Sequence, residues 1–328
     1  MTTSVIERPQ KSLSSKGSSQ GMQGFGETFI SKLPKHIESL KIYGRKISDL
    51  EKKDAVFAQV DNIDAIQSMM REVLLHPIKC EAQFHTEQAF VALLDKDVVD
   101  AGLFKFFNGW NETHKTTSLV SAKLIMRLAA DTAFIHPHKS SGYSLTMAHM
   151  YEVAKDDFGL GHKGHDGMYK YLAEAFGCDQ WINPSYQVQE CNEFSDFLYL
   201  IGVNSHHAPV ESSEYIQSIL SAMMVSISSE LWNGREYNFI AQYIDKKLLK
   251  IKPSLADDDK AFKNARGYIF AHSSEIENKH GLHALAAACV YSRLYNISFD
   301  VDELKRTMLN YNSKVGKAFR ALHQALTE

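Results

Sequence analysis

The chain has 328 residues, of which 44% are hydrophobic and 23% are charged, a composition typical of soluble globular proteins. A formal net charge of -3 gives no basic surface for nucleic acid or anionic membrane, so neither is an expected partner. The expected ligand is a small-molecule substrate.

The N-terminal segment is rich in Ser, Gly and Gln and lacks the apolar run of a signal peptide. We expect residues 1–25 to be a disordered leader and residues 26–328 to form one domain. No later stretch approaches the about 20 apolar residues of a membrane-spanning helix, so a cytoplasmic protein is expected. Four cysteines without Cys-x-x-Cys spacing are expected to be buried free thiols. They are Cys80, Cys178, Cys191 and Cys289.

Apolar residues recur with the period of an α-helix along the chain, and the alternating β-branched residues of strands are missing. Most of the seven prolines fall between the periodic stretches. The pattern predicts an all-α, single-domain protein. The expected helices cover residues 60–75, 86–95, 98–110, 115–134, 144–158, 165–176, 190–203, 212–249, 259–294 and 301–327.

The apolar stripe of the helix expected over 144–158 ends on a carboxylate. Its members, at steps of three and four, are Met147, Met150, Ala154 and Asp157. Asp157 is therefore expected to face the core, whereas Asp156 falls on the other side of the helix. His149 and Glu152 share that other side. The alternative is that Asp157 only ends the helix before a glycine.

A histidine follows across a Gly-rich turn. His165 leads the apolar stripe of the next helix and lies eight residues after Asp157 (165 − 157), so the two should meet near the joined ends of antiparallel helices. His162 lies in the turn and is expected to be solvated. A lone histidine at a helix start is usually structural, so His165 is a candidate only in combination with the other residues.

A second carboxylate interrupts the stripe of the helix expected over 212–249. Glu230 takes the position after Ile216, Leu220, Met223 and Ile227. A charged group at such a position needs a partner. A salt bridge to Arg235, or a side chain that reaches solvent near Gly234, is the ordinary alternative.

The segment AHSSEIENKHGLHALAAA, residues 271–288, places Glu277 and His280 three residues apart on one helical face. A Glu-x-x-His pair projects both side chains toward one ion and is common in carboxylate-bridged dinuclear sites. Burial of several carboxylates and imidazoles in one core carries a cost of desolvation. A cation with two or three positive charges would offset that cost. The sequence therefore predicts a metalloprotein.

In this order the candidate residues resemble the haem-oxygenase-like diiron oxidases and oxygenases. KDDFGLGHKGHDGMYKYLAEAFG is similar to the family's carboxylate, Gly-rich turn and histidine, and Glu277 and His280 match its H-x-x-x-D-x-x-H-G piece. The resemblance covers about residues 100–295 and implies a haem-oxygenase-like helical bundle with two iron ions. The implied ligands are Asp157, His165, Glu230, His272, Glu277 and His280.

The chain departs from that family pattern twice. Ser273 stands four residues before Glu277, where the family has histidine, and the nearest imidazole is His272. In the metal-loaded form we expect a one-residue π-bulge between residues 272 and 277 that turns His272 onto the ligand face. Asp157 stands where the family has glutamate, which is longer by one methylene.

The resemblance implies an oxidoreductase of specialised metabolism, a non-haem diiron monooxygenase or oxidase that uses O2 and an external electron donor. N-oxygenation of a small amine or amino-acid-like substrate is the favoured reaction. Oxidative decarboxylation or desaturation of a fatty or amino acid is the alternative. A homodimer is an open alternative for the assembly.

Two further classes stay open. One is a metal-free helical protein, either a thiaminase-like hydrolase with a cysteine nucleophile or a haem oxygenase with His85 or His114 as proximal ligand. The other is a regulatory protein whose inward carboxylates and histidines form an ordinary buried polar network.

Overall fold

The computed structural model describes residues 19–42, 44–46, 60–157, 165–204 and 208–328, and for a few of these the backbone only. The backbone-only residues are Arg45, Asp156, Asp157, His165 and Asp166. The described part of the chain is helical apart from one short hairpin, which confirms the all-α prediction. In the hairpin, β1 (Lys41–Ile42) pairs antiparallel with β2 (Arg45–Lys46).

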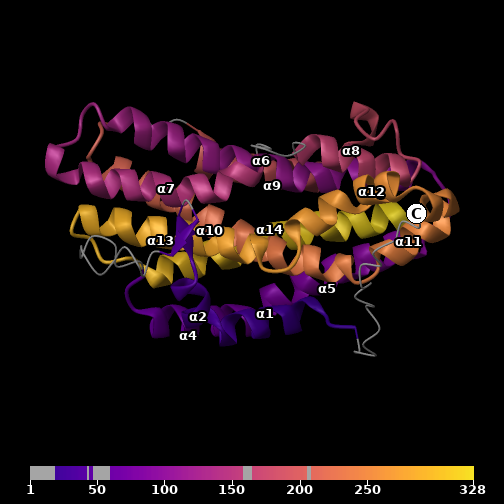
Figure 1. Cartoon of the computed structure of the whole chain (residues 1–328), viewed down its shortest axis with the longest axis horizontal. Coiled ribbons are helices and arrows are strands. Elements are labelled where there is room, and N and C mark those ends of the chain that lie inside the picture. Colours follow the sequence, from indigo (N-terminus) through magenta and orange to yellow (C-terminus); the bar gives the residue numbers. More distant parts are fainter. Residues whose placement is uncertain (1–18, 43, 47–59, 158–164, 205–207) are drawn as a thin grey trace, which may run out of the picture.

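The described helices form three layers along the long axis of the molecule (Figure 1). α6, α7, α8 and α9 form one outer layer, α10, α12, α13 and α14 the middle, and α1, α2, α4 and α5 the other outer layer. The helices are α1 Met22–Ser31, α2 Leu33–Glu38, α4 Ile63–Leu75, α5 Pro77–Asp95, α6 Ala101–Asp131, α7 Ser140–Asp157, α8 His165–Ala175, α9 Gln189–Leu198, α10 Ser213–Ala241, α11 Ile244–Ile251, α12 Asp259–His272, α13 Ile276–Leu294 and α14 Val301–Thr327.

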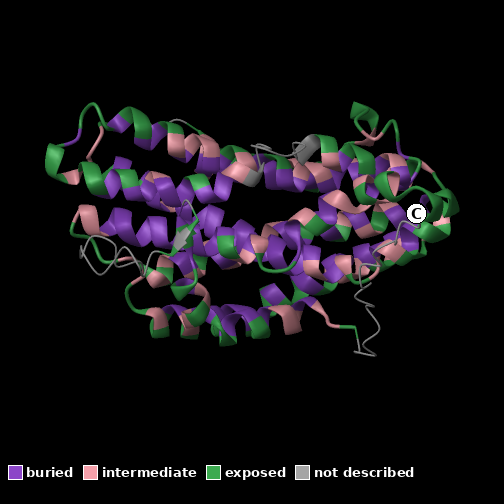
Figure 2. Ribbon diagram, in the orientation of Figure 1, coloured by how far each residue is buried: buried purple, intermediate pink, exposed green. Residues whose placement is uncertain are grey.

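α10 is the central element, since it contributes to both hydrophobic cores of the described structure. Ile227 and Leu231 belong to a core shared with α4, α7 and α13, and Trp232 and Ile240 belong to one shared with α5, α6, α8 and α14. Most of α10 is buried, as is α13 (Figure 2). Side chains on α10 and α13 are therefore removed from water on nearly every face.

Several predicted helix boundaries are wrong. The stretches 98–110 and 115–134 form one helix, α6, which begins where the Asp100 carboxylate accepts a hydrogen bond from the Leu103 amide (3.0 Å). The stretch 212–249 divides into α10 and α11. The stretch 259–294 divides into α12 and α13, because Ser273 is extended and Ser274 has a φ of 66°. Positive φ is unusual outside glycine and stops a helix.

Between residues 272 and 277 the structure has this helix break and no π-helical turn, and the π-bulge predicted for the metal-loaded form stays a prediction. A π-helical segment does occur at Tyr199–Val203, after α9. Ser274 is held at the break by Asn238 of α10, whose amide nitrogen donates to the Ser274 carbonyl and whose oxygen accepts from the Ser274 amide. Tertiary contacts, rather than local sequence, set the direction of α13.

The boundary of the expected leader needs correction as well. Helix α1 begins at Met22, whose side chain is fully buried and whose amide donates to Glu87 (2.6 Å). Residues 1–18 of the expected leader lie outside the described residues. Among the cysteines, Cys80 is exposed, contrary to expectation, while Cys178, Cys191 and Cys289 are buried free thiols.

None of the helices described here has the length and apolar character needed to cross a lipid bilayer.

The contact between α5 and α14 gives a test of this packing. A Cβ added at Gly316 would lie 2.9 Å from the Cα of Ala82, a backbone atom that cannot rotate away. Gly316→Ala should therefore destabilise the protein by about 1–3 kcal/mol, although alanine favours the helix by about 1 kcal/mol. Gly267→Ala on α12 is the matched control, because nothing lies within 4 Å of its added Cβ, and it should stabilise slightly. Urea unfolding of both variants measures the difference; equal effects would contradict the packing.

Candidate metal centre

Two carboxylates and an imidazole converge between α10 and α13. Glu230 comes from α10, and Glu277 and His280 come from one face of α13. The helices approach closely there, because a Cβ on Gly281 would meet the Leu231 side chain at 2.7 Å. The residue after His280 must therefore be very small to bring the three side chains together.

The three side chains lie within coordinating reach of one another. One donor atom from each falls within 4.8 Å of the other two, and all three residues are buried. The His280 Nδ1 atom lies 3.6 Å from Glu277 Oε2 and 3.7 Å from Glu230 Oε2. This is the one group of three or more such residues that the described side chains bring together.

Burial dominates the electrostatics of this cluster. Desolvation, with the Glu277 carboxylate beside it, raises the pKa of Glu230 to about 8, against the lowering effect of His280. Glu230 therefore holds a proton at neutral pH as long as no cation is bound. A bound cation would favour the ionised form and release that proton.

Two oxygens of the cluster are unsatisfied. Glu230 Oε1 and Glu277 Oε1 are buried and take part in no hydrogen bond among the described residues. Buried polar atoms are rarely left in this state unless an ion or water completes them. Two carboxylate oxygens with a neighbouring imidazole suit a divalent first-row transition metal, iron included. The residues present therefore fit the expected ion.

A second carboxylate on α10 is satisfied instead. Glu236 accepts hydrogen bonds from the indole nitrogens of Trp110 (2.6 Å) and Trp232 (2.8 Å), and its Oε1 lies 3.2 Å from His114 Nε2. Although desolvation opposes it, Glu236 raises the pKa of the buried His114. Glu277 contributes to the same shift, so the pair lies within electrostatic reach of the cluster. This network supports the helices around the cluster rather than offering ligands.

His272 lies beside the cluster but outside the group of three. It is buried at the end of α12, its Nδ1 is 2.5 Å from the Tyr268 carbonyl, and its ring stacks on Tyr237. Burial lowers the pKa of His272 to about 4, and the charges of His280 and Glu230 act on it. The imidazole is therefore neutral, the form that binds metals.

The other two expected ligands lie outside the described side chains. Asp157 is the last residue of α7 and His165 the first of α8. His149 and Glu152, which the helical period places on the side of Asp156, are buried as well. This burial follows from the packing of α7 on both α6 and α13, and the choice of Asp157 over Asp156 stays a prediction.

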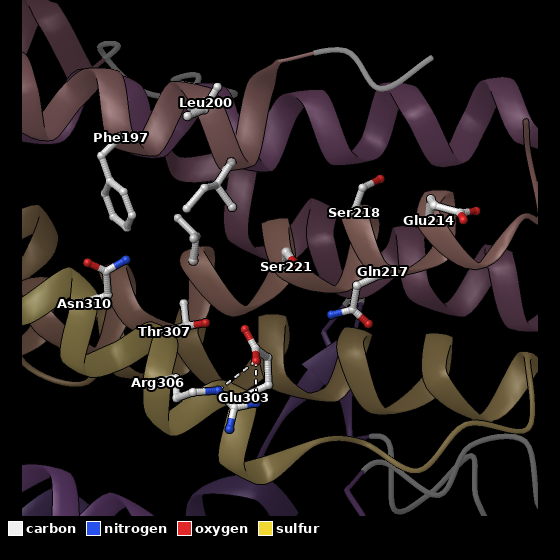
Figure 3. Close-up of a pocket in the computed structure, with 12 residues that line it drawn as sticks. Phe197, Leu200, Glu214, Gln217, Ser218, Ser221, Glu303, Arg306, Thr307 and Asn310 are labelled. Atoms are coloured by element: carbon white, nitrogen blue, oxygen red, sulfur yellow. Dashed lines mark hydrogen bonds and ion pairs between the residues drawn. The ribbon is translucent and has the colours of Figure 1, made fainter. Parts of the chain in front are cut away.

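A cavity of about 260 Å3 reaches the cluster. It is lined by His280 and His283 of α13, Glu152 and Lys155 of α7, and residues around β1. A larger cavity of about 510 Å3 lies elsewhere, between the π-helical segment, α10 and α14 (Figure 3). Its wall includes the Glu303–Arg306 ion pair and none of the three clustered residues. Of these two cavities, the smaller one therefore contacts the cluster, at His280.

Sequence reasoning missed four buried polar residues near the cluster. His283 and Glu236 lie one or two helical turns from predicted ligands, and His149 and Glu152 lie on α7. The His280-x-x-His283 and His149-x-x-Glu152 spacings could have identified three of them, because donors three residues apart share a helical face. Glu236 has no comparable motif.

Comparison of the chain with family models, with curated proteins and with solved structures gives no significant match.

The pKa of Glu230 gives a pH-dependent prediction for the metal-free protein. Its folded-state value lies above the ordinary value, so the folded state binds more protons and stability should fall as pH rises from about 5 to 8. The slope from this residue is at most roughly 1.4 kcal/mol per pH unit. Glu230→Gln keeps the shape of the side chain but cannot ionise. Its stability should therefore decline less between pH 5 and 8 than that of the wild type.

The free energy of unfolding of the wild type and of Glu230→Gln is measured with urea at pH 5, 6.5 and 8, in the presence of a chelator. The relevant quantity is the difference in unfolding free energy between the two proteins at each pH, because the other buried groups titrate in both and cancel. A difference that does not change with pH would show that Glu230 ionises normally.

Proposed function

We propose that this protein is an oxidoreductase that holds iron between α10 and α13 and uses O2 to oxidise a small amine or amino-acid-like substrate. The observation that carries the proposal is the buried group of Glu230, Glu277 and His280, in which two carboxylate oxygens accept no hydrogen bond among the described residues. A purely structural network would satisfy those oxygens, as happens at Glu236.

The proposed centre is dinuclear, with Asp157, His165 and His272 as the additional ligands. Carboxylates suit oxidised iron and can bridge two ions, whereas imidazoles hold the reduced form. When bound, iron would supply the reduction of O2 and the oxidation of the substrate. Electrons would come from an external donor. The haem-oxygenase-like arrangement of the helices is part of the same proposal.

The contributions of the chain itself are binding, orientation and exclusion of water. Glu230 gives up a proton when a cation arrives, so metal affinity should rise with pH. The Glu236–His114 pair and its two indole donors restrain α6 and α10 behind the ligands. Leu231, which lies beside Gly281, is buried and helps to keep bulk water away.

The cavity at His280 would admit the substrate. Its volume of about 260 Å3 suits a small molecule. Lys41, Lys155 and Lys279 line it, against one acidic residue, Glu152, so the wall carries net positive charge. A carboxylate on an amino-acid-like substrate would complement that charge. Oxidative decarboxylation or desaturation would use the same centre, and analysis of products separates these reactions.

The metal-free alternatives have less support. A thiaminase-like hydrolase needs a reactive thiol, but burial raises the pKa of Cys178 and Cys289 to about 12 and that of Cys191 well above its ordinary value. A haem oxygenase with His114 as its proximal ligand would need a free nitrogen on that ring. Both nitrogens of His114 have partners, Trp110 O at 2.9 Å and Glu236 at 3.2 Å.

Removal of one donor tests the proposed centre. Glu277→Ala or His280→Ala should abolish binding of at least one iron ion while the helical fold persists, because alanine favours the helix and the site is held by several elements. Elemental analysis of protein reconstituted with Fe(II) without oxygen counts the ions, and circular dichroism follows the helices.

Glu275→Gln is the matched control, since Glu275 is an exposed acid two residues from Glu277 and pairs only with Lys279 among the ion pairs described. It should bind iron as the wild type does. Full iron content in Glu277→Ala or His280→Ala would refute the ligand assignment.

A further inference from the structure

Two buried cationic side chains have neither a hydrogen bond nor an ion pair among the described residues. They are Lys79 of α5 and Arg235 of α10, which are 1% and 5% exposed. Lys79 Nζ and Arg235 Nε are enclosed and have no hydrogen-bond partner. The other buried lysine and arginine side chains described differ, because Arg127 donates to a serine hydroxyl and Lys247 to a carbonyl and a carboxylate.

The two cations are neighbours between three helices. Lys79 Nζ lies 3.7 Å from the centre of the Trp232 ring, and Trp232 is one helical turn from Arg235 on α10. Burial, and after it the charge of Arg235, lowers the pKa of Lys79 well below its ordinary value. Arg235 also reaches α1, because a Cβ added at Gly26 would lie 3.2 Å from its Nε. The pair therefore lies where α1 and α5 of the outer layer meet α10 (Figure 1).

Among the described residues no carboxylate pairs with either cation. Burial alone lowers the pKa of Arg235 to about 10, so the guanidinium is protonated at neutral pH. Glu236 acts on Lys79, but both of its oxygens accept hydrogen bonds from indoles and one lies 3.2 Å from His114. An unpaired charge in a protein interior is costly, and buried charges are normally paired. The described residues therefore leave these two side chains without a counterion.

A small anion suits both side chains. A guanidinium presents a planar set of donors and an ammonium group a compact charge, so one anion can accept hydrogen bonds from both. A water molecule could accept a hydrogen bond from each, but it brings no charge. Gln83 Oε1, one turn along α5, is a buried acceptor without a partner, and as a neutral amide it too leaves the charges unbalanced. Because Lys79 Nζ and Arg235 Nε are enclosed, the anion must be small.

We propose that Lys79 and Arg235 bind one small monovalent anion, of the size of chloride, between α1, α5 and α10. The bound anion would offset both positive charges and tie the outer layer to the helix that carries Glu230. It would also favour the protonated form of Lys79. This site goes beyond the proposed function and does not depend on it.

The dependence of stability on chloride tests the site. The full-length protein is unfolded with urea in the presence of a chelator, in mixtures of sodium chloride and sodium gluconate at one ionic strength, so that screening stays constant. Gluconate is too large for an enclosed site. For a single bound anion, the folding equilibrium constant should rise about tenfold for each tenfold rise in chloride above the dissociation constant.

Three variants assign the chloride effect to the site. Lys79→Met removes one positive charge and keeps an unbranched side chain of similar length, so this variant should fold and lose the dependence on chloride. Arg235→Met should lose it as well. Lys247→Met is the matched control, because Lys247 is a buried lysine whose amine already has oxygen partners. It should be less stable than the wild type but keep the full dependence on chloride.

Bromide replaces chloride in a second measurement, because its anomalous X-ray scattering identifies it in crystals of the wild type. A bromide ion within hydrogen-bonding distance of Lys79 Nζ and the Arg235 guanidinium would support the site. A wild type whose stability does not respond to chloride would overturn it, as would an equal response in the wild type and Lys79→Met. Bromide bound only elsewhere would overturn it too. Each outcome leaves the proposed iron centre untouched, since unfolding is measured with a chelator.

Discussion

The removal of the Glu230 and Glu277 carboxylates from water costs several kcal/mol for each ionised group, and that cost must be offset locally. The glycine at position 281 lets α10 and α13 approach, which brings His280 between the two acids. Without a cation, Glu230 reduces the cost by keeping a proton, as its pKa of about 8 indicates.

Helix α10 shows two ways of burying a carboxylate within six residues. Both oxygens of Glu236 accept from indole donors and one also lies 3.2 Å from His114, so this carboxylate is complete without a ligand. Glu230 and its neighbour Glu277 each keep an oxygen without a hydrogen-bond partner among the described residues. Burial is therefore common to both carboxylates, and what distinguishes Glu230 from Glu236 is an acceptor oxygen without a partner among the described residues.

Helical period was enough to predict an all-α chain and to direct Glu230, Glu277 and His280 toward a common interior, where the structure brings them together. The same reasoning failed for His149 and Glu152 on α7, because this helix packs on both α6 and α13 and buries polar residues outside its apolar stripe. His149 and Glu152 were lost in this way. The break at Ser273 and Ser274 depends on Asn238, 36 residues away, and the meeting of His149 with His283 depends on tertiary packing. Neither contact has a local signature in the sequence.

The chain contains three tryptophans, and two of them, Trp110 and Trp232, donate to the single carboxylate of Glu236. The emission of an indole shifts with the electric field along its ring, and both rings here experience the charge of Glu236 and its partner His114. The natural fluorescence of the protein is therefore weighted toward the middle of α10, six residues from Glu230. Binding of a cation between α10 and α13, or loss of a proton there, would therefore change the tryptophan emission without any attached label.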